Sequence, residues 1–502
     1  MDRDAVLLLR YFEELCRIPR GSGNEAGVRE SLRAFADEHG FAFAEDAAGN
    51  CVASVPGRGA GEGAPGVIIQ AHMDMVCVKD LEHAAHDFTR DPIRTRVERR
   101  TESGREREFV MATGTTLGAD NGIGLVAAQA VAVDSGITDC PPLELLFTVE
   151  EETGLTGARK MDPDLLRADL LINLDTEEIG EICVSCAGGR DLMAEWKAER
   201  SSPAHGEFPV RLSLTGLPGG HSGVQIHERR GNAITMLIGA ARFTTGFESS
   251  ARLASFSGGT ARNVIPGNAE LVVWVDAAFA ERLRQRFTDP AVRAGIASVV
   301  RTDEPGRIAL GIERVAEGAA PLPISAAQSH RILSAIGALP CGVETWSEVV
   351  EGLVETSNNV AVIGGAQEAF TLQCATRSSA EGAIEALQES MRARLERSGA
   401  SVAFGDGYPG WPADPENQLL RQAERTFERV LGAPPKVMAV HAGLECGVLK
   451  GKRPSLQMIS FGPDIFGAHT VNERVALDTI APFYACLTGL LRDLCQPEAV
   501  AT

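Results

Sequence analysis

A histidine and an aspartate, His72-Met73-Asp74, directly follow the run 67–71, which has the composition of a buried strand. An imidazole nitrogen is a common zinc ligand. In an extended strand end, residues two apart point the same way, so Asp74 can lie beside His72 and orient its ring. One such motif is weak evidence, because a histidine at a strand end is more often a hydrogen-bonded structural group. It predicts a metal site only if partners exist elsewhere in the chain.

Further carboxylates and one histidine lie downstream, beside apolar runs or in glycine-bounded loops: Asp120, Glu151, Glu152, Asp175 and His469. A hydrolase with two divalent ions roughly 3.5–4 Å apart needs a bridging carboxylate, terminal ligands and a base for the attacking water. Taken singly, an aspartate that opens a helix is usually a cap, a glutamate run is usually solvated, and the others can be turn or loop residues. Their occurrence at successive strand ends favours a two-metal hydrolase.

The ligand types narrow the choice of metal. Nitrogen and oxygen donors without cysteine suit Zn²⁺, with Mn²⁺ or Co²⁺ as substitutes. A general base that works near neutral pH needs a raised pKa, and a carboxylate crowded by like charges, as Glu151 is by its neighbours, meets that need.

These residues need a sheet to bring them together, and the first part of the chain has the pattern of one. Its strands alternate with helices, which predicts an α/β fold with a mainly parallel mixed sheet flanked by helices. In such a sheet, active groups lie at the carboxyl ends of strands. The expected helices are 5–18, 24–39 with Asn24 as N-cap, and 121–133; the expected strands are 51–55, 67–71, 143–149 and 170–174.

From residue 188 the pattern changes to alternating strands and longer polar helices, which predicts an inserted α+β domain. We expect two related β-α-β-β halves, because Arg262-Asn263-Val264 and Asn358-Asn359-Val360 each precede a glycine turn and an apolar strand. The first half comprises 208–214, 230–243 and a hairpin ending at 271–275; the second comprises 308–312, 325–337, 349–354, 369–374 and 380–397. With a helix at 416–431, the first pattern resumes. The prediction is a discontinuous catalytic domain, 1–187 and 402–502, with 188–401 as a lid.

Composition limits the class of partner. A formal charge of −20 over 502 residues argues against nucleic acid or an anionic membrane surface, since either would require a basic face. The beginning of the chain lacks the basic and then apolar pattern of a secretion signal, and eleven scattered cysteines fit reduced thiols in the cytoplasm. We interpret Cys183-x-x-Cys186 as a pair of buried thiols, because no second cysteine pair completes a zinc site. A small peptide or metabolite remains as the substrate.

The order and wording of the motifs resemble the aminoacylase/carboxypeptidase/dipeptidase family of co-catalytic zinc peptidases, most closely its aminoacyl-histidine (Xaa-His) dipeptidase branch. The resemblance spans nearly the whole chain in family order. The matching stretches are 70–76, 117–124, 150–157, 173–175, 219–223, 261–266, 441–447 and 466–471.

The resemblance implies a role for each candidate. It implies that His72 and Asp175 bind one zinc, that Glu152 and His469 bind the other, that Asp120 bridges them, that Glu151 is general base and acid, and that Asp74 orients His72. It also implies substrate contacts for His221, Asn263, Arg377, His441 and Glu445.

Structural roles stay open for several of these residues. Arg377 could be a surface charge and Asn263 a turn residue, and a pairing of Glu445 with a free substrate amine is about as well supported as a structural role. Three other histidines have no complementary ligand set and are expected to be bystanders: His83, His86 and His227.

The resulting hypothesis is a cytoplasmic two-zinc dipeptidase that hydrolyses Xaa-His and other unblocked dipeptides with metal-activated water. An N-acyl amino acid deacylase or carboxypeptidase would use the same metals with another pocket, and a catalytically silent binding protein is the alternative from a different class. The arginine-rich segment 94–108 is expected to be a hairpin with its turn at 102–105, near the site entrance. The doubled lid could form a homodimer through a strand edge, or could supply internally what a partner's lid gives in shorter relatives.

Overall fold

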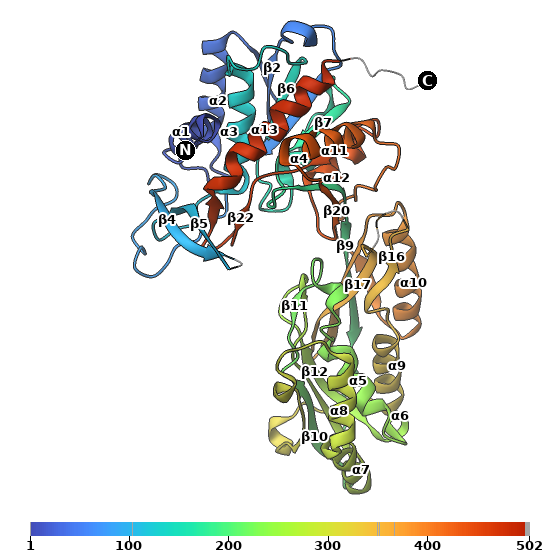
Figure 1. The fold of residues 1–502 in the computed structure, drawn as a ribbon. Coiled ribbons are helices and arrows are strands. Elements are labelled where there is room, and N and C mark those ends of the chain that lie inside the picture. The colour runs from blue at the N-terminus through green and yellow to red at the C-terminus, as the bar shows by residue number, and fades with distance from the viewer. Residues whose placement is uncertain (1, 103, 349, 351, 366, 497–502) are drawn as a thin grey trace. The chain divides into compact units, whose positions relative to one another are not determined.

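The computed structural model describes residues 2–102, 104–348, 350, 352–365 and 367–496. The chain divides into two compact units (Figure 1). Unit 1 comprises Met1–Ser185, Ala413–Ala439 and Leu444–Thr502, and unit 2 comprises Cys186–Pro412 and Val440–Gly443. The division after the insertion therefore lies beyond the expected residue 401. The short stretch 440–443, with His441, belongs to unit 2 rather than to the unit with the zinc candidates.

The main sheet of unit 1 has the strand order β1-β2-β6-β3-β7-β21-β8-β20. Its centre is parallel, since β3 pairs in parallel with β6 and β7, and β7 in parallel with β21. Antiparallel pairs flank this centre. The bounds are β1 Ala42–Glu45, β2 Cys51–Val55, β3 Val67–His72, β6 Leu143–Thr148, β7 Leu170–Asn173, β8 Glu181–Cys186, β20 Lys436–Val440 and β21 Gln457–Ser460. The expected strands 51–55, 67–71, 143–149 and 170–174 are confirmed within one or two residues.

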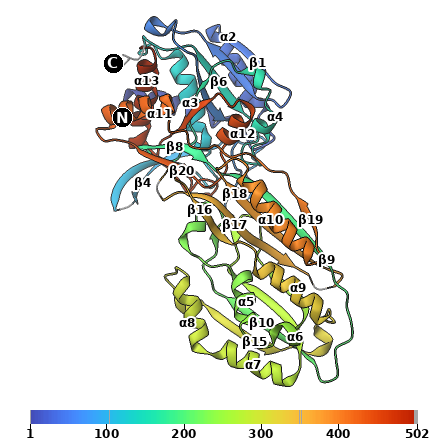
Figure 2. The same ribbon diagram turned by 90° about the vertical axis from the view of Figure 1, so that its right-hand side faces the viewer.

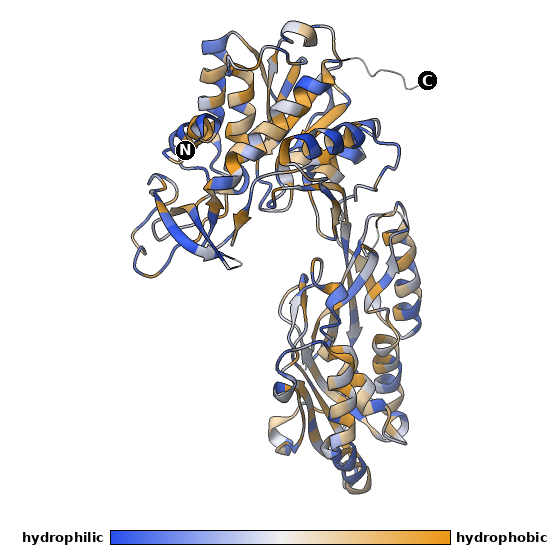
Figure 3. Cartoon of the chain, in the orientation of Figure 1, coloured by the Kyte–Doolittle hydropathy of each residue, from blue (hydrophilic) through white to orange (hydrophobic). Residues whose placement is uncertain are grey.

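Helices cover this sheet and complete its core. Every residue from Gly122 to Ala132 of α3 is buried, which explains its small apolar side chains, whereas α11 has a hydrophilic outer side (Figure 3). Asn24 is not the N-cap of α2; Glu25 takes that position, without a side-chain cap bond. The bounds are α1 Arg3–Leu15, α2 Ala26–His39, α3 Ala119–Val133, α4 Thr156–Lys160, α11 Gln418–Leu431, α12 Glu445–Lys452 and α13 Leu477–Leu494.

The charged segment 94–108 forms the expected hairpin, β4 (Thr95–Glu102) and β5 (Arg105–Ala112), although Ser103 in its turn lies outside the described residues. The hairpin joins β22 (Ile465–Phe466) and β23 (Arg474–Ala476) in a small sheet of order β22-β23-β5-β4. Arg107 anchors it through Asp464 at 2.8 Å and Asp478 at 2.7 Å. Because the loop between β22 and β23 carries His469, the hairpin braces the segment that holds this histidine.

Unit 2 is built on a second sheet, of order β15-β10-β14-β12-β17-β18-β9-β19, with β16 on β17 (Figure 2). The bounds are β9 Gly188–Lys197, β10 Phe208–Thr215, β12 Arg252–Gly258, β14 Ala269–Val275, β15 Ala309–Arg314, β16 Gly342–Trp346, β17 Val354–Gly364, β18 Ala369–Ser378 and β19 Ser401–Phe404. The helices are α5 Ala233–Arg242, α6 Phe247–Ser250, α7 Ala277–Thr288, α8 Pro290–Val299, α9 Ala326–Gly337 and α10 Ala383–Arg397.

Two details of the predicted halves were wrong. The strand expected to open the second half, β15, pairs with β10 of the first half, whereas β9 joins β18. The expected strand 349–354 begins instead at Val354, and residues 349 and 351 lie outside the described chain. Asn358-Asn359-Val360 lies inside β17, which ends at Gly364, and the apolar strand β18 follows from Ala369. Local periodicity could not reveal these pairings, because they are set by contacts between segments distant in sequence.

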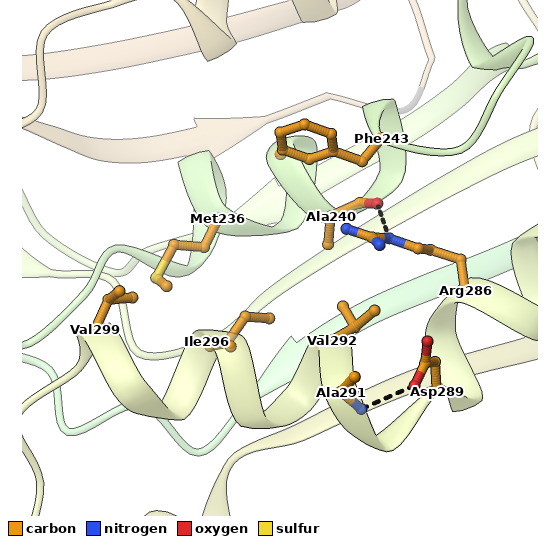
Figure 4. A pocket seen from close by; sticks show the side chains of 11 residues that line it. Met236, Ala240, Phe243, Arg286, Asp289, Ala291, Val292, Ile296 and Val299 are labelled. Atoms are coloured by element: carbon orange, nitrogen blue, oxygen red, sulfur yellow. Dashed lines mark hydrogen bonds between the residues drawn. The ribbon is translucent and has the colours of Figure 1, made fainter.

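An apolar groove of about 390 Å³ lies between α5 and α8 of unit 2 (Figure 4). Of its two charged residues, Arg286 donates to the Ala240 carbonyl at 3.5 Å and Asp289 accepts from the Ala291 amide at 2.8 Å. The groove therefore offers no set of groups for catalysis. Within the described residues, no helix combines the length and the apolarity needed to cross a membrane.

Candidate metal centre

Three neighbouring strands of unit 1 end at the candidate ligands. The order β6-β3-β7 puts the carboxyl ends of these parallel strands side by side. His72 is the last residue of β3, Glu151 and Glu152 follow β6, and Asp175 follows β7. A parallel sheet collects groups at this edge because all of its strands point there.

Asp120 lies between the two histidines. Its Oδ1 is 3.2 Å from His72 Nε2, and its Oδ2 is 3.2 Å from His469 Nε2. His72 Nε2 is also 3.4 Å from Asp175 Oδ1, and His469 Nε2 is 2.9 Å from Glu152 Oε2. The contacts thus form two groups, each with one histidine and one carboxylate, that share Asp120.

The arrangement fits divalent cations. Donor atoms of His72, Asp120 and Glu152 all lie within 4.8 Å of one another. Glu152 Oε1 and Asp175 Oδ1 are buried and have no hydrogen-bond partner among the described residues. Because a buried carboxylate oxygen without a partner is costly, these atoms call for a cation. The five side chains form a candidate metal site with only nitrogen and oxygen donors.

Asp74 holds parts of two strand ends together. Its Oδ1 is 3.4 Å from His72 Nδ1 and accepts from the Glu151 amide at 3.0 Å. Its Oδ2 accepts from Ser22 Oγ at 2.7 Å and from the Glu152 amide at 3.3 Å. Both carboxylate oxygens of Asp74 therefore have partners, which hold the side chain in place. Asp74 in turn positions the ring of His72 and the backbone of the two glutamates.

Two buried charged residues that sequence reasoning missed hold the loop before Asp120. Glu473 accepts the amides of 117–120 at 2.7, 2.9, 2.7 and 3.3 Å. Arg20 donates to the Asp74 carbonyl at 2.9 Å and to the Gly118 carbonyl. Gly118 has φ +71°, and a Cβ there would lie 2.5 Å from Arg20 Nη2, so glycine is required. In the sequence, Glu473 looks like a surface glutamate. Its position four residues after the candidate ligand His469 was the one sign that it could belong to the site.

Burial raises the pKa of the candidate base Glu151 and also that of the candidate ligand Asp175, which rises to about 6. Burial, together with the nearby carboxylates of Asp175, Glu445 and Glu152, holds the pKa of Glu151 well above its usual range despite the opposing effect of His72. Hydrogen bonds to Asp120 and Glu152 raise the pKa of His469 to about 11. A carboxyl with a raised pKa in a cluster of metal ligands is a group suited to move protons.

A second cluster lies in unit 2. Arg377 on β18 donates to Tyr408 Oη at 3.0 Å, while its Nε is buried without a hydrogen-bond partner among the described residues. His441 Nε2 lies 2.7 Å from Ser357 Oγ, and Ser357 is the cross-strand neighbour of Arg377. Burial and the positive charge of Arg377 lower the pKa of His441 to about 3, so this histidine is neutral near pH 7.

His221 lies near this cluster, on the short strand β11 (Gly220–His221). Its Nδ1 accepts from the amides of Gly223 and Val224 at 3.1 and 3.2 Å, so the neutral ring carries its hydrogen on Nε2. Burial and the charge of Arg377 lower its pKa. Asn263 is exposed, and its carbonyl accepts from the Ser222 amide at 2.8 Å.

The remaining candidates have different surroundings. Glu445, expected to face a substrate amine, is fully buried in unit 1, where its Oε2 accepts from Gln70 at 2.6 Å and from Thr148 at 2.7 Å. His83 bonds Asp80 at 2.8 Å. His86 packs edge-on against Phe88 with ring centroids 4.6 Å apart, and His227 is exposed on a short 3-10 turn; neither belongs to the metal cluster.

Comparison with known proteins agrees with this chemistry. Residues 68–493 match Peptidase family M20/M25/M40. The chain is 35% identical over 485 residues to the cytosol non-specific dipeptidase of Escherichia coli strain K12, and the alignment covers 96% of each protein.

Solved structures give the same result. The aminoacylhistidine dipeptidase from Vibrio alginolyticus matches with a TM-score of 0.87 and 34% identity, over 98% of both chains. The aminopeptidase PepT from Bacillus cereus ATCC 10987 matches at a TM-score of 0.55 and 16% identity, over 98% of this chain and 99% of that one, which shows a shared fold alone. The family match and the full-length relatives show that this chain belongs to Peptidase family M20/M25/M40 and is a hydrolase.

Proposed function

We propose that the chain is a dipeptidase with two divalent metal ions that cleaves Xaa-His and other unblocked dipeptides. The observation that carries this proposal is the position of Asp120, whose two oxygens each lie 3.2 Å from a different histidine. A carboxylate shared in this way suits a bridging ligand. In this proposal His72 and Asp175 bind one ion, and Glu152 and His469 bind the other.

When bound, two such ions would supply an acidified water and polarise the peptide carbonyl. Glu151 takes the proton of the attacking water and delivers it to the nitrogen of the leaving amine. Its raised pKa supports this role, because a base must hold the proton long enough to pass it on. Asp74 keeps the Nε2 of His72 directed toward the metal side by contacting Nδ1 of the ring.

Unit 2 has groups suited to the negative charges of the substrate and of the reacting carbonyl oxygen. Arg377 is a cation whose buried Nε has no hydrogen-bond partner in the described part of the chain, and such a group is suited to the terminal carboxylate of a dipeptide. His221 presents a protonated Nε2 as a donor for a carbonyl oxygen that becomes negative during the reaction. We propose substrate contacts for these two residues and for the exposed Asn263 and the neutral His441.

A panel of substrates tests the proposal. The metal-loaded protein should cleave free dipeptides, including Xaa-His, and should lose activity when the substrate amine is acylated. Preference for N-acyl amino acids would instead identify a deacylase or carboxypeptidase, and inactivity toward every member would favour a silent binding protein. Parallel assays with Zn²⁺, Mn²⁺ and Co²⁺ identify the most active metal; we propose Zn²⁺, since imidazole and carboxylate donors suit it.

We also propose that the reaction takes place in the cytoplasm. This rests on the name of the E. coli relative, a cytosol dipeptidase, and on the scattered, mostly buried cysteines, among them Cys183 and Cys186. Fractionation of cells that produce the protein checks it. A homodimer through unit 2 stays a prediction, for which light scattering of the purified protein is the measurement.

A further inference from the structure

A chain of buried polar side chains crosses the central strands of unit 1 behind the metal ligands. Ser460 of β21 donates to Asn173 Oδ1 on β7, and Asn173 Nδ2 donates to Gln70 Oε1 on β3. Gln70 Nε2 donates to Glu445 Oε2 at 2.6 Å, as Thr148 Oγ1 of β6 does at 2.7 Å. All five side chains are fully buried. These side chains therefore connect the four parallel strands through buried hydrogen bonds.

The hydrogen bonds in this row of side chains all run in one donor-to-acceptor order, and Glu445 determines that order. A side-chain amide can turn either way, with oxygen and nitrogen exchanged. Glu445 is the only carboxylate among these five side chains. It accepts hydrogen bonds from Gln70 and Thr148, so Gln70 must present its NH₂ group to it. Gln70 then presents oxygen to Asn173, and Asn173 presents oxygen to Ser460. Without an acceptor at 445, only the Asp175 amide, which donates to Asn173 Oδ1 at 3.2 Å, favours this orientation over its reverse.

The orientation reaches the metal ligands through the backbone. Asn173 Oδ1 also accepts the amide of Asp175 at 3.2 Å, a bond that the reversed amide could not make. Gln70 stands two residues before His72 on β3, so the two side chains share one side of the strand. Glu445 thus acts on two strand ends that carry ligands, although its own oxygens contact neither ligand in the hydrogen bonds of the described residues.

We propose that Glu445 is a positioning residue, which fixes the orientation of Gln70 and Asn173 and thereby holds His72 and Asp175 for metal binding. This positioning role takes the place of the role expected from the sequence, in which Glu445 contacts a substrate amine. The inference rests on the proposed metal site, but not on the identity of the peptide that is cleaved.

Two substitutions of Glu445 distinguish the effect of its hydrogen-bond acceptor from the effect of its negative charge. Glu445→Leu removes the acceptor at similar size. Glu445→Gln keeps one oxygen that can accept from Gln70 and Thr148, and loses the charge. We expect Glu445→Leu to weaken Zn²⁺ binding by about 10- to 100-fold, as is typical when a group that orients metal ligands is lost, and Glu445→Gln to restore it to within about threefold of the original protein. The measurement is a competition titration of the metal-free protein with a chromophoric chelator, without any peptide.

A contact with the substrate amine predicts a different pattern. Zn²⁺ affinity would then be unchanged in both variants, and KM for free dipeptides would rise in Glu445→Gln as much as in Glu445→Leu, since both lack the charge. That result would overturn the proposal. Because the titration needs no catalysis, a protein that binds Zn²⁺ as expected but cleaves no dipeptide would refute the proposed function and leave this inference intact.

Controls address folding. Glu181→Leu removes another buried glutamate of the same sheet, whose partner is Lys436 at 2.5 Å, and should leave Zn²⁺ affinity unchanged. If Glu445→Leu does not fold by circular dichroism, Gln70→Met replaces it, because methionine is of similar length and lacks the amide that connects Glu445 to Asn173. A folded Gln70→Met protein with unchanged Zn²⁺ affinity would then contradict the proposal.

Discussion

The polar cluster of unit 1 lacks positive charge to balance its carboxylates, and the polar cluster of unit 2 lacks negative charge to balance its arginine. In unit 1, Asp120, Glu152 and Asp175 surround two histidines, and buried carboxylate oxygens have no hydrogen-bond partner among the described residues. In unit 2, the buried Nε of Arg377 has no hydrogen-bond partner among the described residues, and burial together with the charge of Arg377 lowers the pKa values of His221 and His441. The first cluster is suited to cations and the second to an anion. A metallopeptidase acting on a substrate with a free carboxylate needs both.

The clusters also differ in how their side chains are held. Carboxylates of unit 1 accept several backbone amides, as Asp74 and Glu473 do, so the main chain itself fixes the site. The side chains of Arg377 and His441 instead contact the hydroxyls of Tyr408 and Ser357. We therefore expect substitutions in unit 1 to act on metal binding and turnover, and those in unit 2 to act on substrate selection.

The largest effect is expected for Glu151→Gln. The amide cannot accept the proton of the attacking water, so kcat should fall about 1,000-fold, within the range that general bases contribute. Zn²⁺ content, measured by atomic emission on the same sample, should be unchanged, since the metal contacts run through Glu152 and not Glu151. Turnover close to that of the unsubstituted enzyme would show that another residue is the base.

A smaller effect, confined to one class of substrate, is expected for Arg377→Met. Loss of the guanidinium should lower kcat/KM about 100-fold for dipeptides with a free carboxylate, because a charge-assisted, two-point contact is removed. C-terminally amidated dipeptides should be cleaved by both proteins at similar, low rates. Arg262→Met is the matched control, since Arg262 is 57% exposed and pairs with Asp191 at 3.5 Å. An equal loss on amidated substrates would contradict the carboxylate contact.

The sequence allowed prediction where local signals and chemistry agree. β3, β6 and β7 are apolar runs that end at His72, Glu151 and Asp175, so periodicity and residue type indicate the same edge of the sheet. Strand order is not encoded locally, which is why β15 was assigned to the wrong half of unit 2.

Buried polar residues were the other limit. Arg20 and Glu473 are ordinary surface types by composition, and only the fold shows that both are buried. Gln70 lies in a run expected to be a buried strand, but its partners could not be predicted. Glu445 was noticed, but its partners Gln70 and Thr148 are 375 and 297 residues away in sequence, and without them its surroundings could not be deduced. Groups that support ligands through distant partners thus escape a motif search.

A loss of about 10-fold in Zn²⁺ affinity is expected for Glu473→Gln. The four amides of 117–120 would then face one oxygen and one NH₂ group in place of a carboxylate, so the loop that positions Asp120 is held less firmly. Chelator competition on the metal-free protein measures it. Glu228→Gln, at a partly exposed ion pair with Arg230 in unit 2, is the control and should not change the affinity. If the two variants bind Zn²⁺ equally, the loop does not need its carboxylate.

The smallest effect is a dependence of stability on pH that originates in unit 2. Folding lowers the pKa of His441 from 6.5 to about 3, through burial and then the charge of Arg377. The unfolded chain therefore binds a proton at this residue more readily than the folded one between these values, so stability is complete above pH 6.5 and falls as the pH decreases toward 3. Between about pH 7 and about pH 5.5 the loss should be roughly 1 kcal/mol.

Urea unfolding of the original protein and of His441→Gln at both pH values isolates this contribution. Glutamine can keep a hydrogen bond to Ser357 and does not titrate, so the variant should lose about 1 kcal/mol less than the original protein on acidification. The comparison must follow a signal from unit 2, such as Trp196 or Trp274 fluorescence, because the two units need not unfold together. Equal losses in both proteins would mean that His441 is protonated as easily in the fold as in water, and the contrast between an anionic and a cationic cluster would then depend on Arg377 alone.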